Sequence, residues 1–428
     1  MSESRRRQVW VRTWGDSASE SVKASFSTRR VPREAMRTLV GGAVRPRPGD
    51  LVLASIARLG QHRKLETAEG RRAFLHLGDQ IVVVYGDRYA PDQYESHVPS
   101  NLGPTQLVAS GGIASSMISR SQDVRSATDI TPIALIGDER GRPLNLADFA
   151  LDPDRLAPTR PRTIAVVGTS MNSGKTTTIH YLAHALARAG VRPGVTKVTG
   201  TGSGGDYWVM LDAGVHQMLD FTDAGLASTY RQPMDVIERA MSTLLTELTL
   251  NGCGVRLVEV ADGIFQSETS RLVASPLFSE QIDAVIFAAG DAMGAYAGVT
   301  HLKSMGFDVL AVSGKLTRSP LAVREAAEAT GLPVLGIPEL SDPVIAAQLL
   351  GVELPPTVEQ GEDDALPSPW SETDLFQQVM AGGLPAPDPE QRVDARSPFE
   401  PDAVDPDSVR WEHVTTIDLN ALTTTESA

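Results

Sequence analysis

The sequence predicts an α/β protein in which a parallel-sheet domain follows a smaller β-rich domain and precedes a mostly disordered acidic tail. Three observations carry this prediction. Residues 31–127 contain several short runs that are rich in Val, Ile and Leu. Over 163–352, continuous apolar strands alternate with helical patterns, which is typical of a parallel sheet covered on both faces. Pro, Asp and Glu then dominate 353–428, where apolar residues are few.

Composition limits what the protein can be. The chain has 428 residues, 41% hydrophobic and 21% charged, which is ordinary for a globular protein of two or three domains. No apolar run approaches the roughly 18–20 residues of a membrane span, and the first residues lack the apolar stretch of a secretory signal, so we expect no membrane partner. The only cysteine, Cys253, excludes an internal disulfide and fits a cytoplasmic location.

Charge is unevenly distributed along the chain. The segment 353–428 holds 17 acidic residues and 3 arginines, which accounts for the whole net charge of −14. Residues 1–30 form a basic arm that we expect to be solvated and partly disordered. A nucleic-acid partner is not expected, because no basic module interleaved with aromatic residues accompanies this arm.

Residues 31–127 are predicted to form a small barrel or meander. Its Val- and Ile-rich runs, "GDLVLASIARLG", "RAFLHLG" and "DQIVVVYG", are each bounded by Gly or Asp, as strands joined by turns would be. Residues 128–162 are predicted to form a hairpin around "DERG", followed by the linker "DPDRLAPTRPR".

The C-terminal half is predicted to alternate strands and helices. Ligands bind such a sheet at the carboxyl ends of its strands. The expected strands are "TIAVVG", "RPGVTKVTG", "VRLVEVADG", "DAVIFAAGD", "DVLAVSG" and "LPVLGIP", and the expected helices span about 174–189, 233–252, 294–305 and 320–330.

The stretch "VVGTSMNSGKTTT", residues 166–178, joins the first of these strands to the first helix. It ends as a phosphate-binding P-loop does, in Gly-Lys-Thr, and strand, loop and helix occur in the required order. Lys175 would then bridge the β- and γ-phosphates of ATP, and the Thr176 hydroxyl would reach Mg²⁺. This segment therefore predicts a P-loop NTPase domain. The predicted nucleotide contacts are Gly168, Thr169, Asn172, Ser173, Gly174, Lys175, Thr176 and Thr177.

The glycine that usually opens a P-loop would fall at position 169, but it stands one place earlier, at Gly168. A glycine followed by a threonine, here Gly168 and Thr169, resembles the loop of dethiobiotin synthetase and cobyrinic acid diamide synthases. The sequence departs from that pattern at Ser170 and Met171, where the family has Asp and Thr. The signature lysine of MinD-like proteins is also absent at Ser170, which argues against a partitioning role. The resemblance covers about 163–340.

A second lysine, Lys197, ends the next apolar strand, where dethiobiotin synthetase has a lysine near phosphate and substrate; Val198 replaces the family's proline. The small polar residues that follow are predicted substrate contacts, and the alternative is a solvated Gly-rich loop. We assign Thr201, Ser203 and Asp206 to the substrate, with Asp206 also a candidate Mg²⁺ ligand.

Glu259 ends another buried strand and resembles the Glu of the family's V-E-G-A-G-G segment. A carboxylate there is costly unless it is paired or metal-bound, and Mg²⁺ prefers one or two carboxylates with phosphate and water. We therefore predict that Glu259 and Thr176 hold Mg²⁺ and that Glu259 acts with the catalytic Lys175 and Lys197. A plain salt bridge is the alternative, and the role of Asp262 stays open.

The long polar segment "QMLDFTDAGLASTYRQPMD" supplies three further substrate candidates, Asp220, Asp223 and Tyr230, although helix capping explains some of them equally well. No guanine-reading [NT]-K-x-D motif is present, which favours ATP over GTP.

The resemblance implies an ATP- and Mg²⁺-dependent ligase that activates a carboxylate or carbamate, working as a homodimer with its site near the subunit interface. A similarity in layout to D-glutamate N-acetyltransferase-like P-loop proteins points to an amino-acid-like substrate. The alternative is a nucleotide-dependent switch or carrier that acts through a protein partner. The extra domains at both ends favour that alternative, since dethiobiotin synthetase needs neither.

Overall fold

The computed structural model describes residues 8–15 and 21–355. The chain divides into two compact units, Met1–Gly383 and Leu384–Ala428. The second unit lies outside the described residues, as does nearly all of the predicted acidic tail.

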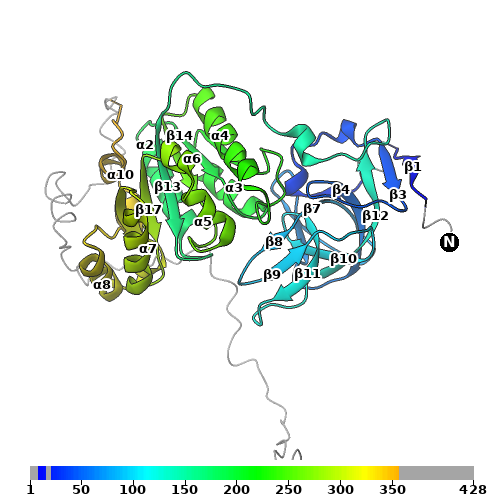
Figure 1. Ribbon diagram of the computed structural model, residues 1–428, viewed down its shortest axis with the longest axis horizontal. Coiled ribbons are helices and arrows are strands. Elements are labelled where there is room, and N and C mark those ends of the chain that lie inside the picture. The colour runs from blue at the N-terminus through cyan, green and yellow to red at the C-terminus, as the bar shows by residue number, and fades with distance from the viewer. Residues whose placement is uncertain (1–7, 16–20, 356–428) are drawn as a thin grey trace, which may run out of the picture. The chain divides into compact units, whose positions relative to one another are not determined.

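The N-terminal domain contains a closed barrel. Strands β12, β4, β7, β11 and β10 pair in that order, and β10 pairs back to β12. Alternate residues of β4 fill two cores: Leu51 and Leu53 face one cluster, and Val52, Ala54 and Ile56 the other. The strands, traced in Figure 1, are β1 Trp10–Thr13, β2 Lys23–Ala24, β3 Thr38–Gly41, β4 Leu51–Arg58, β5 Lys64–Glu66, β6 Arg72–Phe74, β7 Gln80–Tyr85, β8 Arg88–Tyr89, β9 Tyr94–His97, β10 Thr105–Ala109, β11 Ile113–Arg120 and β12 Thr128–Gly137.

The expected basic arm is not a free arm where the structure describes it. Strand β1 pairs antiparallel with β3, and β2 pairs with β7. A short 3₁₀ helix follows at Phe26–Thr28, and the Phe26 side chain is fully buried. An aromatic anchor of this size holds the segment to the domain despite its basic charge. The expected boundary between residues 127 and 128 also falls inside the barrel, because β12 is one of its strands.

The C-terminal domain is a parallel six-stranded sheet in the order β15-β14-β16-β13-β17-β18. Side chains of β13 alternate between two cores. Ile164 and Val166 pack with helix α2, whereas Ala165 and Val167 pack with α4 and α7. Both faces are therefore covered, as the continuous apolar strands predict. The strands are β13 Arg162–Gly168, β14 Pro193–Lys197, β15 Gln217–Asp220, β16 Val255–Glu259, β17 Ala284–Ala288 and β18 Val309–Ser313.

Helices connect these strands. The predicted helices appear as α2, α4, α7 and α8 at nearly the expected bounds. The structure adds an edge strand, β15, and a helix, α3, where the sequence indicates only polar loops. The prediction of a strand at "LPVLGIP" is wrong. This segment forms a single β-bridge, from Val334 to Val312, and helix α9 follows directly. The helices are α2 Lys175–Arg188, α3 Gly204–Asp212, α4 Met234–Leu250, α5 Ser267–Val273, α6 Pro276–Gln281, α7 Ala292–Ser304, α8 Pro320–Thr330, α9 Ile337–Leu340 and α10 Pro343–Leu350.

Two features of the fold place the site. Strand β13 lies at the centre of the sheet and ends at Gly168, where the P-loop begins. Its neighbour β16 and the next strand β14 end in register, with Glu259 opposite Lys197. The P-loop, Lys197 and Glu259 therefore converge at the carboxyl ends of neighbouring strands.

Candidate functional site

The P-loop connects β13 to α2 through a backbone that few residues can adopt. Gly174 caps α2 with a φ of 108°, and a side chain there would press on Gly314, its Cβ only 2.7 Å from the Gly314 Cα. Asn172 also has a positive φ, 62°. The amide of Lys315 donates to the Ser173 carbonyl at 2.9 Å, which ties the loop to the end of β18. The Ser173 hydroxyl is buried and has no hydrogen-bond partner among the described residues.

Lys175 is buried beneath this loop, not exposed on it. Its Nζ donates to the carbonyl oxygens of Ser170 and Asp262, both at 2.8 Å. Desolvation by burial lowers the pKa of Lys175, although the charge of Glu259 acts against this shift. An ammonium held only by neutral carbonyls can exchange them for phosphate oxygens at a gain, because charge-assisted hydrogen bonds are stronger.

Lys197, Glu259 and Asp206 form a charged cluster next to the loop. The Lys197 ammonium makes an ion pair with Asp206 on α3 and lies 3.6 Å from Glu259 Oε1. Burial disfavours the ammonium, but the two carboxylates outweigh that cost and raise the pKa of Lys197. Burial raises the pKa of Glu259, whereas Lys197 outweighs burial at Asp206 and lowers its pKa. The cluster therefore keeps Lys197 positively charged at the carboxyl end of the sheet at neutral pH.

Two side chains at this edge fit a magnesium ion. Thr176 Oγ1 donates to Glu259 Oε1 at 3.0 Å, so the two predicted ligands are already together. Glu259 is 2% exposed, and its Oε2 has no hydrogen-bond partner in the described part of the chain. A buried, unpartnered carboxylate oxygen is costly and suits a cation. Asp206 is less suited than expected, because its carboxylate is paired with Lys197.

No all-protein metal cage exists in the described ranges, where no group of three or more His, Cys, Asp or Glu side chains could hold an ion. A Thr176–Glu259 pair would instead need phosphate oxygens and water to complete the shell, which is how Mg²⁺ is usually held. Asp262, which the sequence left open, has a positive φ of 65°, and burial raises its pKa.

Asp220 and Asp223 do not form the open substrate contacts that the sequence predicts. Both are buried, and Arg29 of the N-terminal domain contacts them at 3.1 and 2.6 Å. The Arg29 guanidinium also donates to Thr222. Two buried carboxylates need a counter-charge, so this pair serves to join the barrel to the sheet.

Among the described residues, two of the remaining substrate candidates contact the N-terminal domain, and the third does not. Thr201 forms a bridge with Ser228 of its own domain. The Ser203 hydroxyl donates to Glu66 at 3.2 Å, and the Tyr230 hydroxyl donates to Glu95 at 3.3 Å. Each candidate thus has a different partner, and none of these contacts brings the three to one ligand.

The N-terminal domain reaches the P-loop itself. Asn172 Nδ2 donates to Asp92 Oδ2 at 2.9 Å, between β8 and β9. Arg231 contacts Asp87 at 3.3 Å. No local pattern predicts these partners, because they lie 80 and 144 positions apart in the chain and only the fold joins them.

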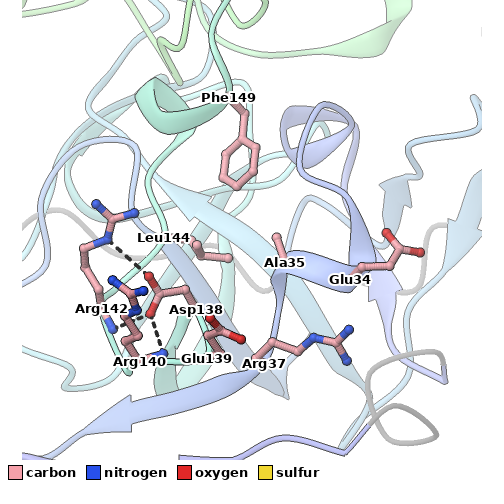
Figure 2. Close-up of a pocket in the computed structure, with 9 residues that line it drawn as sticks. All are labelled: Glu34, Ala35, Arg37, Asp138, Glu139, Arg140, Arg142, Leu144 and Phe149. Carbon is pink, nitrogen blue, oxygen red and sulfur yellow. Dashed lines mark hydrogen bonds and ion pairs between the residues drawn. The ribbon is translucent and has the colours of Figure 1, made fainter.

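A cavity of about 640 Å³ lies in the N-terminal domain, and none of the predicted site residues lines it. Figure 2 shows Arg142 directed at Asp138, which accepts from its Nε at 3.3 Å. This cavity is lined by Glu34, Ala35, Arg37, Asp138, Glu139, Arg140, Arg142, Leu144 and Phe149. A second cavity, of about 440 Å³, is lined by Gln61, His62, Arg63, Lys64, Glu66, Arg72, Gln93 and Ser110.

Fold and loop together define a P-loop nucleotide-binding domain with an N-terminal β-barrel domain. No protein-family model matches the chain, and no curated protein matches it. Across residues 8–15 and 21–355, no helix is long and apolar enough to cross a membrane.

Solved structures that resemble the chain include signal recognition particle receptors. FtsY from Elizabethkingia anophelis is 15% identical over 47% of this chain and 59% of its own, with a TM-score of 0.27. Chloroplast FtsY from Physcomitrella patens is 15% identical over 48% and 70%, with a TM-score of 0.31. The Elizabethkingia protein in complex with GDP is 14% identical over 49% and 71%, with a TM-score of 0.29. The chain thus spans under two thirds of the first of these. TM-scores this low support no conclusion about function, and the P-loop domain rests on its own geometry.

Proposed function

We propose that the protein is an ATP- and Mg²⁺-dependent ligase that activates a small-molecule carboxylate by phosphoryl transfer. The observation that carries this proposal is a second lysine beside the P-loop, Lys197, whose side chain is 16% exposed. A P-loop needs only Lys175 to hold phosphates. Lys197, held 3.6 Å from Glu259, adds a fixed cation where a phosphoryl group and an attacking oxyanion would meet.

The proposed reaction has two steps. A carboxylate oxygen of the substrate attacks the γ-phosphorus of ATP, the bond to the β–γ bridging oxygen breaks, and ADP leaves with the electron pair. An amine then attacks the acyl phosphate, forming an amide and releasing phosphate and a proton. Lys175 and Lys197 would offset the charge on the transferred group, and Asp206 would position Lys197. Thr176 and Glu259 would hold Mg²⁺, which neutralises phosphate charge when bound.

The test is phosphate release from ATP and from GTP, with the full chain alone and with pools of carboxylic acids and amines. We expect ATP turnover that one pool stimulates. Replacing Lys175 with Met should reduce turnover by about 10²–10³-fold, because the phosphates lose their fixed cation. The exposed Lys303 on α7 provides the matched control, and its replacement should leave turnover unchanged. Turnover that survives Lys175→Met refutes the P-loop assignment.

A nucleotide-dependent switch is the second candidate, and one contact favours it. Asn172 of the P-loop is bonded to Asp92 of the barrel domain, so a nucleotide that reorganises the loop would act directly on the other domain. Slow turnover that no small molecule changes would support this function over the ligase. Limited proteolysis with and without nucleotide would then show whether the barrel responds. Homodimerisation stays a prediction, which sedimentation of the purified chain checks.

A further inference from the structure

Helix α3 carries the acid that holds Lys197, and its two ends are anchored by different domains. Asp206 lies in the first turn of the helix and makes an ion pair with Lys197. Towards the other end, the carbonyl oxygen of Val209 accepts from His180 Nδ1 of α2 at 3.0 Å. The second half of α3 is therefore fixed within its own domain, whereas the turn that contains Asp206 needs another support.

The local sequence gives that first turn little support. Gly204 and Gly205 open the helix, and glycine costs more conformational entropy in a helix than any other residue. The N-cap residue, Ser203, makes no side-chain capping bond to the helix. A first turn built in this way frays unless its free amides find an acceptor elsewhere. The place of Asp206 therefore depends on contacts from outside the helix.

Glu66, the last residue of β5, supplies the missing acceptor from the barrel domain. Its carboxylate is buried, and its two oxygens face different partners. Oε2 accepts from the Gly204 amide at 2.7 Å and from the Ser203 hydroxyl at 3.2 Å. Oε1 accepts from the Ser110 hydroxyl at 3.2 Å and lies 3.4 Å from Arg72 Nη2. One oxygen is thus held by the barrel while the other caps the helix, where a negative charge also favours the helix dipole.

Two aromatic side chains of α3 also contact the barrel domain. The ring centroids of Tyr207 and Phe26 are 5.4 Å apart. Trp208 lies against Gly70, in the turn between β5 and β6, where a side chain would place its Cβ 2.7 Å from Trp208 Cε2. Close approach of this kind needs a glycine. The barrel therefore fixes both where α3 begins and which way its first turns face.

We propose that Glu66 is a positioning residue of the P-loop site, which acts through α3 to keep Asp206 on Lys197. The inference rests on the proposed function, because it assigns the placement of a proposed catalytic lysine to the barrel domain. Glu66 itself binds the start of the helix and acts on the lysine only through Asp206. The barrel domain is then a part of the catalytic apparatus.

The first test is hydrogen–deuterium exchange of the full chain without nucleotide. Glu66→Gln leaves a neutral acceptor, and Glu66→Ala removes both oxygens. We expect the amides of residues 204–212 to exchange faster, by at least about threefold in the Gln variant and about tenfold in the Ala variant. Asp129→Asn is the matched control, since this carboxylate pairs with Arg58 at 2.7 Å inside the barrel and should leave α3 unchanged.

Two further measurements report on Lys197 itself. An amine-labelling reagent should modify this partly buried lysine more slowly than the exposed Lys303 in the wild-type protein. In Glu66→Ala its labelling should become at least about threefold faster, because α3 no longer shields it. The kcat for ATP turnover should fall by about tenfold with KM for ATP unchanged, since the P-loop keeps its own contacts. Glu66→Gln should restore part of that loss.

Several outcomes overturn the inference. These are wild-type exchange of α3 in both Glu66 variants, exchange that rises equally throughout the chain, unchanged labelling of Lys197, or a KM for ATP that rises while kcat is kept. If Glu66→Ala does not fold, Glu66→Gln decides by the same measures. Normal turnover in both variants refutes the role of Glu66 and leaves the ligase standing. Loosening of α3 and faster labelling of Lys197 in a protein without ATP turnover would refute the ligase and support the positioning contact.

Discussion

Replacing Arg29 with Met should destabilise the fold by about 3–5 kcal/mol near neutral pH. The Arg29 side chain is 10% exposed and lies 3.1 Å from Asp220 and 2.6 Å from Asp223, whose side chains are 4% and 6% exposed. The substitution would leave two buried carboxylates that act on each other, with Arg30 at 3.6 Å as the remaining ion-pair partner in the described residues. The cost arises from this uncompensated charge and exceeds the net value of the salt bridge itself.

The loss should depend on pH. Burial, together with the charge of Asp220, raises the pKa of Asp223 to about 6 even with Arg29 present. Because this pKa lies above the pKa of Asp223 in the unfolded chain, the folded state binds the proton more tightly. The contribution of Asp223 to stability therefore falls as pH rises from about 4 to about 6. Without Arg29 the carboxylates are charged and unmatched, so the loss should be larger near pH 8 than near pH 5.

Urea unfolding followed by tryptophan fluorescence measures the effect. Arg30→Met is the matched control, since that neighbour is 33% exposed and 3.6 Å from Asp223, and it should cost under about 1 kcal/mol. Converting Asp220 and Asp223 to Asn in the Arg29→Met background should restore most of the stability. A loss from Arg29→Met below about 1 kcal/mol, or one that does not change with pH, would refute the reasoning.

Two further predictions follow from the cluster and the core. Glu259→Gln should raise the Mg²⁺ concentration needed for half-maximal turnover by at least about tenfold, because the unpartnered Oε2 becomes a neutral amide group; a Mg²⁺ titration checks this, and an unchanged midpoint contradicts it. Burial raises the pKa of the Cys253 thiol to about 11, so it should not react with a disulfide reagent near pH 8 until urea unfolds the protein. Rapid reaction of the folded protein with the reagent would contradict the burial of the Cys253 thiol.

Local sequence patterns determined the central architecture. Continuous apolar runs predict buried parallel strands, since their side chains must face a core on both sides. The spacing of Gly168, Gly174, Lys175 and Thr176 predicts a loop that joins strand to helix, because chain order and backbone freedom are local properties. Lys197 and Glu259 each end an expected strand, which predicts that both lie at the carboxyl end of the sheet. In the structure they are opposite each other, on β14 and β16. That these residues act on a nucleotide remains the proposal.

Helix α3 shows why the rest could not be predicted. Gly204 and Gly205 open it, although glycine disfavours helices, and its N-cap Ser203 makes no side-chain capping bond. The first amide, that of Gly204, instead donates to Glu66, which lies 138 residues earlier in the chain. A cap supplied from another domain leaves no trace in the local sequence.

Charge matching is the other property that only the tertiary structure decided. The sequence presents Asp220 and Asp223 as candidate substrate contacts, and it places Arg29 in the basic arm 1–30 and Arg88 in the β-rich segment 31–127. The fold buries Asp220, Asp223 and Arg88, pairs the 10% exposed Arg29 side chain with both carboxylates, and leaves Arg88 without an ion pair among the described residues. The sequence shows which charges exist, but their energies depend on burial and on partners. Both are set by long-range contacts, so only the folded chain distinguishes a charge that joins two domains from one that is buried without an ion pair.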